Sequence, residues 1–301
     1  MNYNKEEILS PNRVALIVLN YNDAETTTKM VDEICKWKSN LLDFRVIVVD
    51  NRSSDGSFER LKQHFGIAEC VDVIISERNG GYSYGNNFGA RFAIDNYHPE
   101  FIAIANPDIV VDESTMIQLL QTFRKNDQIA MCAPVMKSLD GSYRVYSQTL
   151  PSWKDDLKAC RLRNKSATLH MEGYETLDIE GNMILTEMLP GSFFVIRTSC
   201  FEEIGMLDEN VFLYCEERIL GRKLKDAGYK AILRKDLFFV HAHAVSTSKA
   251  FSVLKREKLM LNSCYYYQKE YGHCNKGQLL LLEAAMGLYQ QELTALYHIR
   301  N

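Results

Sequence analysis

The chain has 301 residues, of which 46% are hydrophobic and 25% charged, a composition typical of a folded globular protein and not of a disordered one. Its formal net charge of −4 argues against nucleic acid as the main partner. The eight cysteines stand singly, without a CxxC pair, which favours reduced, buried thiols over a disulfide framework or a zinc site. The polar residues 1–7 do not resemble a secretory signal, and no apolar run reaches the roughly 18 residues of a membrane-spanning helix. We therefore expect a cytoplasmic protein.

Short apolar runs alternate with helical patterns in the first third of the chain. The predicted strands cover residues 14–20, 44–49, 71–76 and 101–105. The predicted helices between them cover residues 26–38, 57–65 and 84–96. Continuous apolar runs of this length are typical of strands buried on both faces, and their alternation with helices implies right-handed crossovers. The sequence thus predicts an α/β fold with a mainly parallel central sheet flanked by helices.

The second half of the chain is less regular. Residues 137–185 are mixed and polar, so we expect loops and short strands around an acceptor region there. Beyond them, strands are predicted over residues 188–197 and 231–240, and helices over residues 201–205, 216–228, 251–271 and 276–297. This pattern divides the chain into a first domain of residues 1–250 and a C-terminal helical extension of residues 251–301.

Polar residues cluster directly after four of the predicted strands. They are Asn20, Asn22, Asp50, Asn51, Asn79, Asn106 and Asp108. Ligands of open α/β sheets bind beyond the carboxyl ends of the strands, so four separate strand ends point to one cleft.

A stretch rich in glycine and asparagine runs from Asn79 to Gly89 and includes Gly80, Gly81 and Asn87. Glycines let the backbone approach a ligand closely, and asparagines can donate to phosphate or ribose. The stretch is neither a GxGxxG fingerprint nor a phosphate loop ending in Gly-Lys-Ser/Thr, which disfavours dehydrogenases and NTPases. It could be a plain loop, but its position before the strand over residues 101–105 favours a binding role.

Two aspartates follow buried strands. Asp50 can accept hydrogen bonds from a base imide or a ribose hydroxyl, although a turn role is the simpler alternative. Asp108 closes the sequence Asn106-Pro107-Asp108 and suits a hard cation that bridges two phosphates, although this sequence alone could also be an ordinary turn.

Two glutamates begin the predicted helix over residues 216–228. Glu216 and Glu217 could simply complement the helix dipole. Because they follow the aromatic residues Phe212 and Tyr214, one of them could instead act as a general base in an aromatic cleft. His241 ends the last predicted strand and is a further candidate metal ligand.

Taken in chain order, these motifs resemble the family 2 glycosyltransferases, above all their rhamnosyltransferase-like branch. The resemblance spans roughly residues 13–270 and rests on the segments 18–22, 48–51, 79–89, 106–108, 189–194, 216–217, 228–229 and on His241. It implies a GT-A fold, a nucleoside-diphosphate-sugar donor and usually Mg²⁺ or Mn²⁺.

The resemblance also implies residue roles. The family's Asp-x-Asp motif corresponds to residues 106–108, where Asn106 replaces the first aspartate, so Asp108 would carry the metal with the diphosphate and His241. Glu217 occupies the position of the catalytic base, and Glu216 is its substitute.

For the nucleotide, the resemblance implies that Asp50 contacts the base and that Asn20 and Asn87 line the site. The donor would be a UDP- or dTDP-sugar, with rhamnose as the leading sugar. The acceptor would be a saccharide or a lipid-linked saccharide of a bacterial surface polysaccharide, attacked in one inverting displacement.

Positive charge is concentrated between Arg218 and Lys258, where eleven Lys/Arg stand against three Asp/Glu. This excess fits either a solvated helix face or a surface that meets pyrophosphate or the inner face of the cell membrane. The apolar C-terminal helices could rest on that membrane, cap the domain, or form a homodimer. Two alternatives to an active transferase remain: an inactive relative that serves as a binding subunit, and a sugar nucleotidyltransferase.

Overall fold

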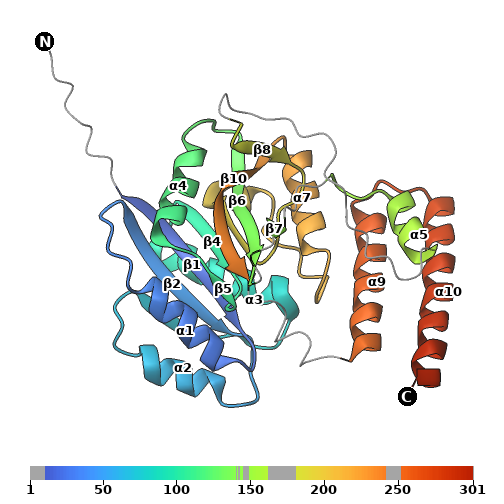
Figure 1. Ribbon diagram of the computed structural model, residues 1–301, viewed down its shortest axis with the longest axis horizontal. Helices are drawn as coiled ribbons and strands as arrows, with labels where there is room; N and C mark the ends of the chain where they lie inside the picture. Colours follow the sequence, from blue (N-terminus) through green and yellow to red (C-terminus); the bar gives the residue numbers. More distant parts are fainter. Residues whose placement is uncertain are drawn as a thin grey trace, which may run out of the picture.

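The computed structural model describes residues 11–139, 141, 143–144, 149–161, 181–241 and 252–300. The strands among them are β1 (Asn12–Asn20), β2 (Leu42–Asp50), β3 (Val71–Ile75), β4 (Phe101–Ala105), β5 (Ile109–Val110), β6 (Ile129–Ser138), β7 (Tyr143–Arg144), β8 (Met183–Thr186), β9 (Phe193–Arg197) and β10 (Lys230–His241). They form one sheet in the order β3-β2-β1-β4-β9-β6-β10-β5, with β7 beside β6 and β8 beside β10 (Figure 1).

Helices cover both faces of this sheet (Figure 1). The described helices are α1 (Ala24–Ile34), α2 (Ser57–Phe65), α3 (Gly81–Tyr97), α4 (Glu113–Phe123), α5 (Trp153–Arg161), α6 (Thr198–Glu203), α7 (Glu216–Asp226), α9 (Val253–Glu270) and α10 (Lys276–Arg300). Side chains of α1, α2 and α4 share one hydrophobic cluster with the sheet, and those of α3, α6 and α7 share the cluster on its other face.

The sheet is parallel from β3 through β2 and β1 to β4, and again between β6 and β10. Between these two parts, β9 runs antiparallel to both β4 and β6. The prediction of an α/β fold with a mainly parallel sheet is confirmed. A strand was predicted over this segment, but its reversed direction was not, because strand direction leaves no trace in a short apolar run.

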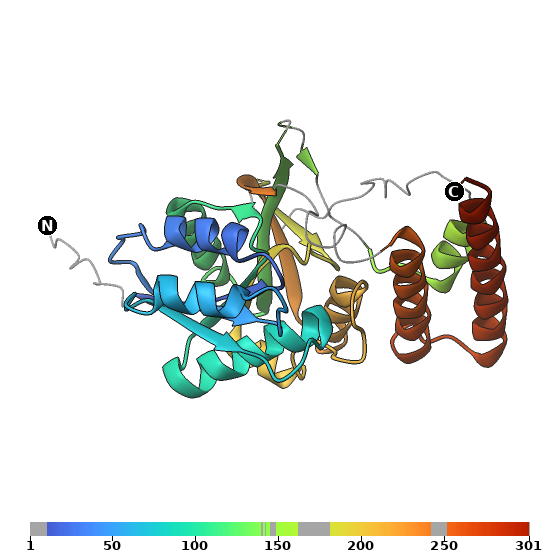
Figure 2. The ribbon, with the colours of Figure 1, turned by 90° about the horizontal axis from the view of Figure 1, so that it is seen from below.

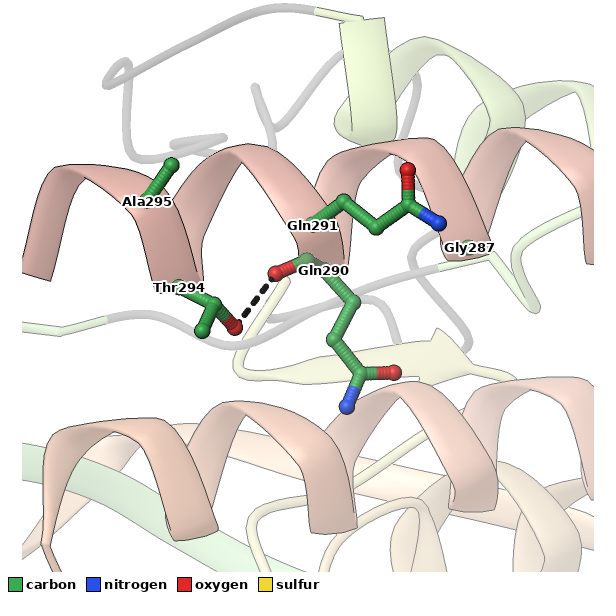
Figure 3. A pocket seen from close by; sticks show the side chains of 5 residues that line it. All are labelled: Gly287, Gln290, Gln291, Thr294 and Ala295. Atoms are coloured by element: carbon green, nitrogen blue, oxygen red, sulfur yellow. Dashed lines mark hydrogen bonds between the residues drawn. The ribbon is translucent and has the colours of Figure 1, made fainter.

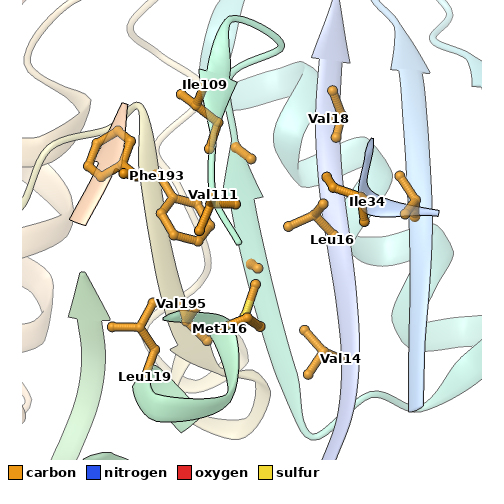
Figure 4. Packing of buried hydrophobic residues seen from close by; sticks show 14 of the residues in the cluster. Val14, Leu16, Val18, Ile34, Ile109, Val111, Met116, Leu119, Phe193 and Val195 are labelled. Carbon is orange, nitrogen blue, oxygen red and sulfur yellow. The ribbon is translucent and has the colours of Figure 1, made fainter. Parts of the chain in front are cut away.

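Strand β1 shows why the apolar runs are continuous. Val14, Leu16 and Val18 point toward the α1 and α4 side (Figure 4), whereas Ala15 and Ile17 belong to the cluster on the opposite face. All five side chains are buried. Successive strand residues alternate between faces, so a strand covered on both sides must be apolar at every position.

The glycine-rich stretch is mostly helical, which corrects the expectation of a turn before a helix at residue 84. Helix α3 begins at Gly81 and includes Gly85 and Gly89. A Cβ added at Gly85 would lie 2.3 Å from Leu19 Cδ1, and one at Gly89 would lie 2.6 Å from Val49 Cγ2. These glycines therefore allow α3 to pack closely on β1 and β2.

Replacing Gly89 by alanine is expected to lower the free energy of unfolding by about 1–3 kcal/mol, because the new methyl group overpacks the helix–sheet contact. Urea unfolding measures the change. The matched control is Gly287→Ala in α10, where an added Cβ meets nothing within 4 Å. That variant is expected to gain up to about 1 kcal/mol from helix propensity. A Gly89→Ala protein as stable as the control would contradict the packing account.

Other element boundaries also differ from those predicted. The strand predicted over residues 188–197 begins only at Phe193, because Pro190 and Gly191 precede it in a turn. Helix α1 begins two residues earlier than predicted, since Asp23 caps it through a hydrogen bond from the Thr26 N–H. Helix α4 and strand β6 had no predicted counterpart.

Helices α9 and α10 lie together with α5 to one side of the sheet (Figures 1 and 2). The buried members of their hydrophobic cluster are Leu157, Val211, Cys215, Ile219, Cys264, Tyr267, Leu282 and Met286. Tyr266 and Tyr271 donate hydroxyl hydrogen bonds to Asp208 Oδ2 at 2.9 and 2.6 Å. The C-terminal helices are thus joined both to α5 and to the segment that leads into α7. The predicted domain boundary at residue 250 lies outside the described residues.

No described helix combines the length and apolar character that crossing a membrane requires.

Candidate active site

The ends of β1 and β2 are joined through their side chains. Asn20 Nδ2 donates to Asp50 Oδ2 at 2.8 Å, and both residues are fully buried. Asp50 Oδ1 accepts from the Ser53 N–H at 2.8 Å, and Asn20 Oδ1 accepts from Thr27 Oγ1 at 2.8 Å. These two predicted nucleotide-site residues therefore lie together and form the rigid floor of the strand-end surface.

Asn22 links the loops that follow the same two strands. Its N–H donates to Ser53 Oγ and its Oδ1 accepts from the Ser54 N–H, both at 2.8 Å. Unlike the floor residues, Asn22 is exposed. It can therefore meet a ligand above the buried Asn20–Asp50 pair.

A second polar cluster joins β2 to the start of α3. Asn51 Nδ2 donates to Asn79 Oδ1 and to the Gly81 carbonyl, each at 3.1 Å. The Gly81 N–H in turn donates to Asn79 Oδ1 at 3.2 Å, and Gly80 is the residue that precedes the helix. The structure thus brings these four predicted residues together, beside the Asn20–Asp50 pair.

Asn87 does not join either cluster. Its Nδ2 donates to the Leu207 carbonyl and to Glu209 Oε1, both at 2.9 Å, and its Oδ1 accepts from the Leu207 N–H at 3.1 Å. The side chain is buried and holds α3 against the segment before α7. A nucleotide-binding role for Asn87 stays a prediction.

The two predicted metal ligands lie next to each other. Asp108 Oδ1 is 3.1 Å from His241 Nε2, and both side chains are mostly buried. Strand pairing between β5 and β10 places His241 opposite Ile109, which accounts for this contact. No described group of three or more His, Cys, Asp or Glu side chains could hold an ion alone. One carboxylate and one imidazole nevertheless fit a divalent ion that takes its other ligands from diphosphate oxygens and water.

Glu217 lies near the same end of the sheet. A Cβ added at Gly191 would be only 3.0 Å from Glu217 Oε1, so the carboxylate rests against that glycine. The next residue, Ser192, accepts a hydrogen bond from the Asn106 N–H at 2.8 Å, which extends the pairing of β4 with β9. The candidate base therefore contacts Gly191, and the segment that leads to Asp108 is hydrogen-bonded to the residue after it.

Tyr82 connects these groups, although the sequence predicted no role for it. It follows Gly81, and its hydroxyl donates to the Gly191 carbonyl. Burial raises its pKa, and the nearby Glu216 and Glu217 carboxylates raise it further. A single tyrosine after a glycine pair gives no signal in the sequence for a contact with residue 191.

The turn before the two glutamates has an unusual backbone. Tyr214 and Cys215 have φ values of 74° and 66°, which only glycine adopts freely. The Phe212 carbonyl accepts from the Tyr82 N–H at 3.0 Å and leaves no room for a side chain at Gly81. Strained residues of this kind cost about 1–3 kcal/mol each and cluster at functional sites.

The two glutamates differ in environment. Glu216 is only 7% exposed, and its Oε1 has no hydrogen-bond partner among the described residues. Burial, with a contribution from the Glu217 charge, raises the pKa of the Glu216 carboxyl to about 8. Glu217, which lies against Gly191, is partly exposed. Glu217 is therefore the better placed of the two to reach a ligand.

The Glu216→Gln variant is expected to gain stability relative to the wild type as the pH rises from 5 to 9. The raised pKa means that the folded chain binds more protons than the unfolded chain between about pH 4.5 and 8. Stability contributed by neutral Glu216 is complete below this window and is lost as the pH rises through it, whereas glutamine stays neutral. Because the pKa of Glu216 is raised by at least one unit, the stability of the variant relative to the wild type is expected to change by more than about 1.4 kcal/mol. Urea unfolding at both pH values measures it, and a pH-independent difference would show that Glu216 is not held neutral.

A surface hollow on α10 lies outside this group of residues (Figure 3). Its lining consists of Gly287, Gln290, Gln291, Thr294 and Ala295. Thr294 Oγ1 donates to the Gln290 carbonyl of its own helix, and the lining has no charged side chain. The hollow therefore lacks the groups that hold a charged nucleotide.

The chain matches the family model described as Glycosyl transferase family 2 over residues 15–205. The chain belongs to the family 2 glycosyltransferases. The match covers β1 through α6 and includes the clusters at the ends of β1, β2 and β4.

Curated relatives support the rhamnosyltransferase-like branch. An N-acetylglucosaminyl-diphospho-decaprenol L-rhamnosyltransferase of Mycobacterium tuberculosis is 25% identical over 216 residues, which are 68% of this chain and 68% of that protein. The low-salt glycan biosynthesis hexosyltransferase Agl10 of Haloferax volcanii is 26% identical over 211 residues, or 68% of this chain. The aligned part is only 59% of the length of that archaeal relative.

Solved structures confirm the GT-A fold of this glycosyltransferase. GalNAc-T7 with UDP, GalNAc and Mn²⁺ matches with a TM-score of 0.62 at 14% identity, over 96% of this chain and 57% of that one. The mannosyltransferase PcManGT from Pyrobaculum calidifontis, in complex with GDP-Man and Mn²⁺, matches with a TM-score of 0.57 at 16% identity. The latter match covers 97% of this chain and 78% of that one.

Proposed function

We propose that the chain transfers rhamnose or another hexose from a UDP- or dTDP-sugar to a saccharide or lipid-linked acceptor in bacterial surface polysaccharide synthesis. The observation that carries this proposal is that Glu217 contacts Gly191 while Asn106, two residues before Asp108, is hydrogen-bonded to the adjoining Ser192. An inverting transfer needs a base beside the acceptor hydroxyl and a carboxylate near the leaving diphosphate, within reach of one sugar, and these contacts support such an arrangement.

The donor nucleotide is assigned to the ends of β1 and β2. Asp50 and Asn51 are held by buried hydrogen bonds, and Asn22 is exposed above them. Rigid polar groups of this kind suit a base and ribose, because they lose little freedom when the ligand binds. The solved neighbours hold UDP or GDP-mannose, which supports a nucleoside-diphosphate sugar here.

Asp108 and His241 are the residues that would hold Mg²⁺ or Mn²⁺ on the donor diphosphate. A bound divalent ion supplies a counter-charge for the diphosphate as it leaves. The Mn²⁺ in both solved neighbours supports a metal-dependent enzyme.

In the proposed inverting reaction, Glu217 takes the proton of the acceptor hydroxyl while that oxygen attacks the anomeric carbon. The bond to the diphosphate breaks on the opposite side of the sugar, so the configuration inverts. Gly191 leaves room beside the Glu217 carboxylate, and Tyr82 fixes the Gly191 carbonyl. These residues position the base, and positioning alone can contribute several kcal/mol to catalysis.

A lipid-linked acceptor would place the enzyme at the inner face of the cell membrane. The mycobacterial relative is named for a decaprenol-linked acceptor, which supports this class. Part of the basic excess after residue 217 already pairs within the chain, as Arg218 does with Asp156 and Lys225 with Glu187. We therefore assign any membrane contact to the exposed side of the C-terminal helices, where Leu280, Leu281 and Leu288 also offer a homodimer surface.

A binding subunit without activity is the second candidate, because Asn106 replaces the first aspartate of the family's metal motif. The family match speaks against the third reading, a sugar nucleotidyltransferase.

Thermal unfolding of the wild type with UDP, dTDP, GDP or NAD, each with and without Mn²⁺, tests the donor site. A nucleoside diphosphate at about 100 times its Kd is expected to add about 2.7 kcal/mol of stability, and only with Mn²⁺. If no nucleoside diphosphate stabilises the protein, the proposed donor site is wrong. Stabilisation without sugar transfer from any of the matching donors would favour the binding subunit.

A further inference from the structure

Two cysteine thiols are in contact at the turn that precedes the candidate base in the sequence. Cys215 is the residue that precedes α7, and Cys264 lies on α9. Their sulfur atoms are 3.4 Å apart, and the residues are only 6% and 7% exposed. This contact joins the turn that carries Glu216 and Glu217 to the C-terminal helices, and the proposed reaction does not use it.

An arginine distinguishes the two thiols. Arg218 Nη1 lies 3.5 Å from Cys264 Sγ and 2.8 Å from Asp156 Oδ1. The hydrogen bond from Cys215 lowers the pKa of the Cys264 thiol, and the Arg218 charge lowers it further. The thiolate is the reactive form of cysteine, so the contact with Arg218 favours Cys264 over Cys215 as the nucleophile of the pair.

Another thiol pair in the chain provides a comparison. Cys35 Sγ and Cys70 Sγ are 3.5 Å apart, at the end of α1 and just before β3. Burial raises the pKa of Cys35 to about 12, and its hydrogen bond with Cys70 adds to this shift. The thiol contact and burial raise the pKa of Cys215 in the same way. The contact of Arg218 with Cys264 therefore distinguishes the Cys215–Cys264 pair. The similarly spaced Cys35–Cys70 pair serves as an internal control.

We propose that Cys215 and Cys264 form a redox-active thiol pair that hydrogen peroxide converts to a disulfide. The Cys264 thiolate attacks one peroxide oxygen, the O–O bond breaks, and hydroxide leaves, which takes up a proton to become water. The Cys215 sulfur then attacks the resulting sulfenic acid, an S–S bond forms, and a second water leaves. Two thiols are oxidised by two electrons, and one peroxide is reduced to two waters.

The cross-link would move the turn that carries the glutamates. A disulfide requires a sulfur separation of about 2.0 Å, so the two sulfurs must approach by roughly 1.4 Å. Cys215 adjoins Glu216 and already has a left-handed backbone, so this displacement is passed to Glu217. Misplacement of a reacting group by about 1 Å can cost 10²-fold in rate. We expect oxidation to lower sugar transfer at least tenfold, an expectation that rests on the proposed function.

The test exposes the intact wild-type chain to hydrogen peroxide, blocks remaining thiols with N-ethylmaleimide, and maps tryptic peptides by mass spectrometry. Residues 198–218 and 259–269 form the two peptides concerned, and fragment ions separate Cys215 from Cys200. The expected product is these peptides joined, two hydrogen atoms lighter than their sum, and separated again by dithiothreitol. The Cys35→Ser/Cys70→Ser variant is expected to give the same product.

The cross-link is measured without any sugar substrate, so its outcome is independent of the proposed function. If Cys215 and Cys264 both stay alkylatable while free N-acetylcysteine in the same tube is oxidised, the proposal is wrong. It is equally wrong if Cys35–Cys70 oxidises first and Cys264 does not react. A cross-link that forms without a loss of transfer activity would overturn the coupling to the base.

Discussion

The Glu217→Gln variant is expected to transfer sugar about 10²–10⁴-fold more slowly than the wild type, with donor affinity unchanged. Glutamine keeps the size of the side chain against Gly191 but cannot take the proton of the acceptor hydroxyl. The proposed donor site at the ends of β1 and β2 and at Asp108 is unchanged, so the nucleotide Kd should stay the same. Turnover with saturating donor, together with the nucleotide Kd, measures both effects.

Glu216→Gln is the matched control, since it changes the neighbouring carboxylate in the same way. Glu216 is buried and held neutral, so its replacement is expected to change the rate of transfer far less than replacement of Glu217 does. The reverse order of effects would assign the base to Glu216. Equal turnover in both variants and the wild type would remove this carboxylate pair from the mechanism.

The Asp108→Asn variant is expected to lose most of the Mn²⁺-dependent affinity for the nucleoside diphosphate, a rise in Kd of at least about tenfold or 1.4 kcal/mol. The change keeps the shape of the side chain and its contact distance to His241 but removes the negative charge that a divalent ion requires. Titration calorimetry with and without Mn²⁺ separates the metal-dependent affinity from the contacts of the base and ribose.

Asp112→Asn is the control for this experiment. Asp112 caps α4 by accepting from the Thr115 N–H at 2.7 Å, and asparagine caps helices about as well as aspartate. The Asp112→Asn change removes one negative charge four residues from Asp108. The nucleotide Kd and the free energy of unfolding should both stay near their wild-type values. If Asp108→Asn binds nucleotide as tightly as Asp112→Asn in Mn²⁺, the metal does not rest on Asp108.

The sequence was sufficient to predict which strand-end residues of the candidate site lie together, because strand ends in a parallel sheet meet at one edge. Asn20 and Asp50 end neighbouring parallel strands in register, so their contact follows from the strand pattern alone. The meeting of Asp108 with His241 needed the family resemblance, since it depends on the short antiparallel pairing of β5 with β10.

Contacts between segments far apart in sequence could not be predicted. The bond from Tyr82 to Gly191 spans 109 residues, and the amide contacts of Asn87 with Leu207 span 120. Local composition also misled: the glycines of α3 suggested close approach of a ligand, whereas Gly85 and Gly89 allow close approach of a helix to the sheet. A pattern of small residues looks the same in both cases.

The packing of α5 with α9 and α10 has a consequence for the order in which the chain folds during its synthesis. Leu157, Ile219 and Tyr267 share one cluster, although more than one hundred residues separate the first from the last. During synthesis from the N-terminus, the sheet can form before α9 has been made. The turn at Tyr214–Cys215 cannot yet make its contacts with α9, such as that of Cys215 with Cys264. We therefore expect the turn before the candidate base Glu217 to be among the last segments to become fixed, after the buried Asn20–Asp50 pair has formed.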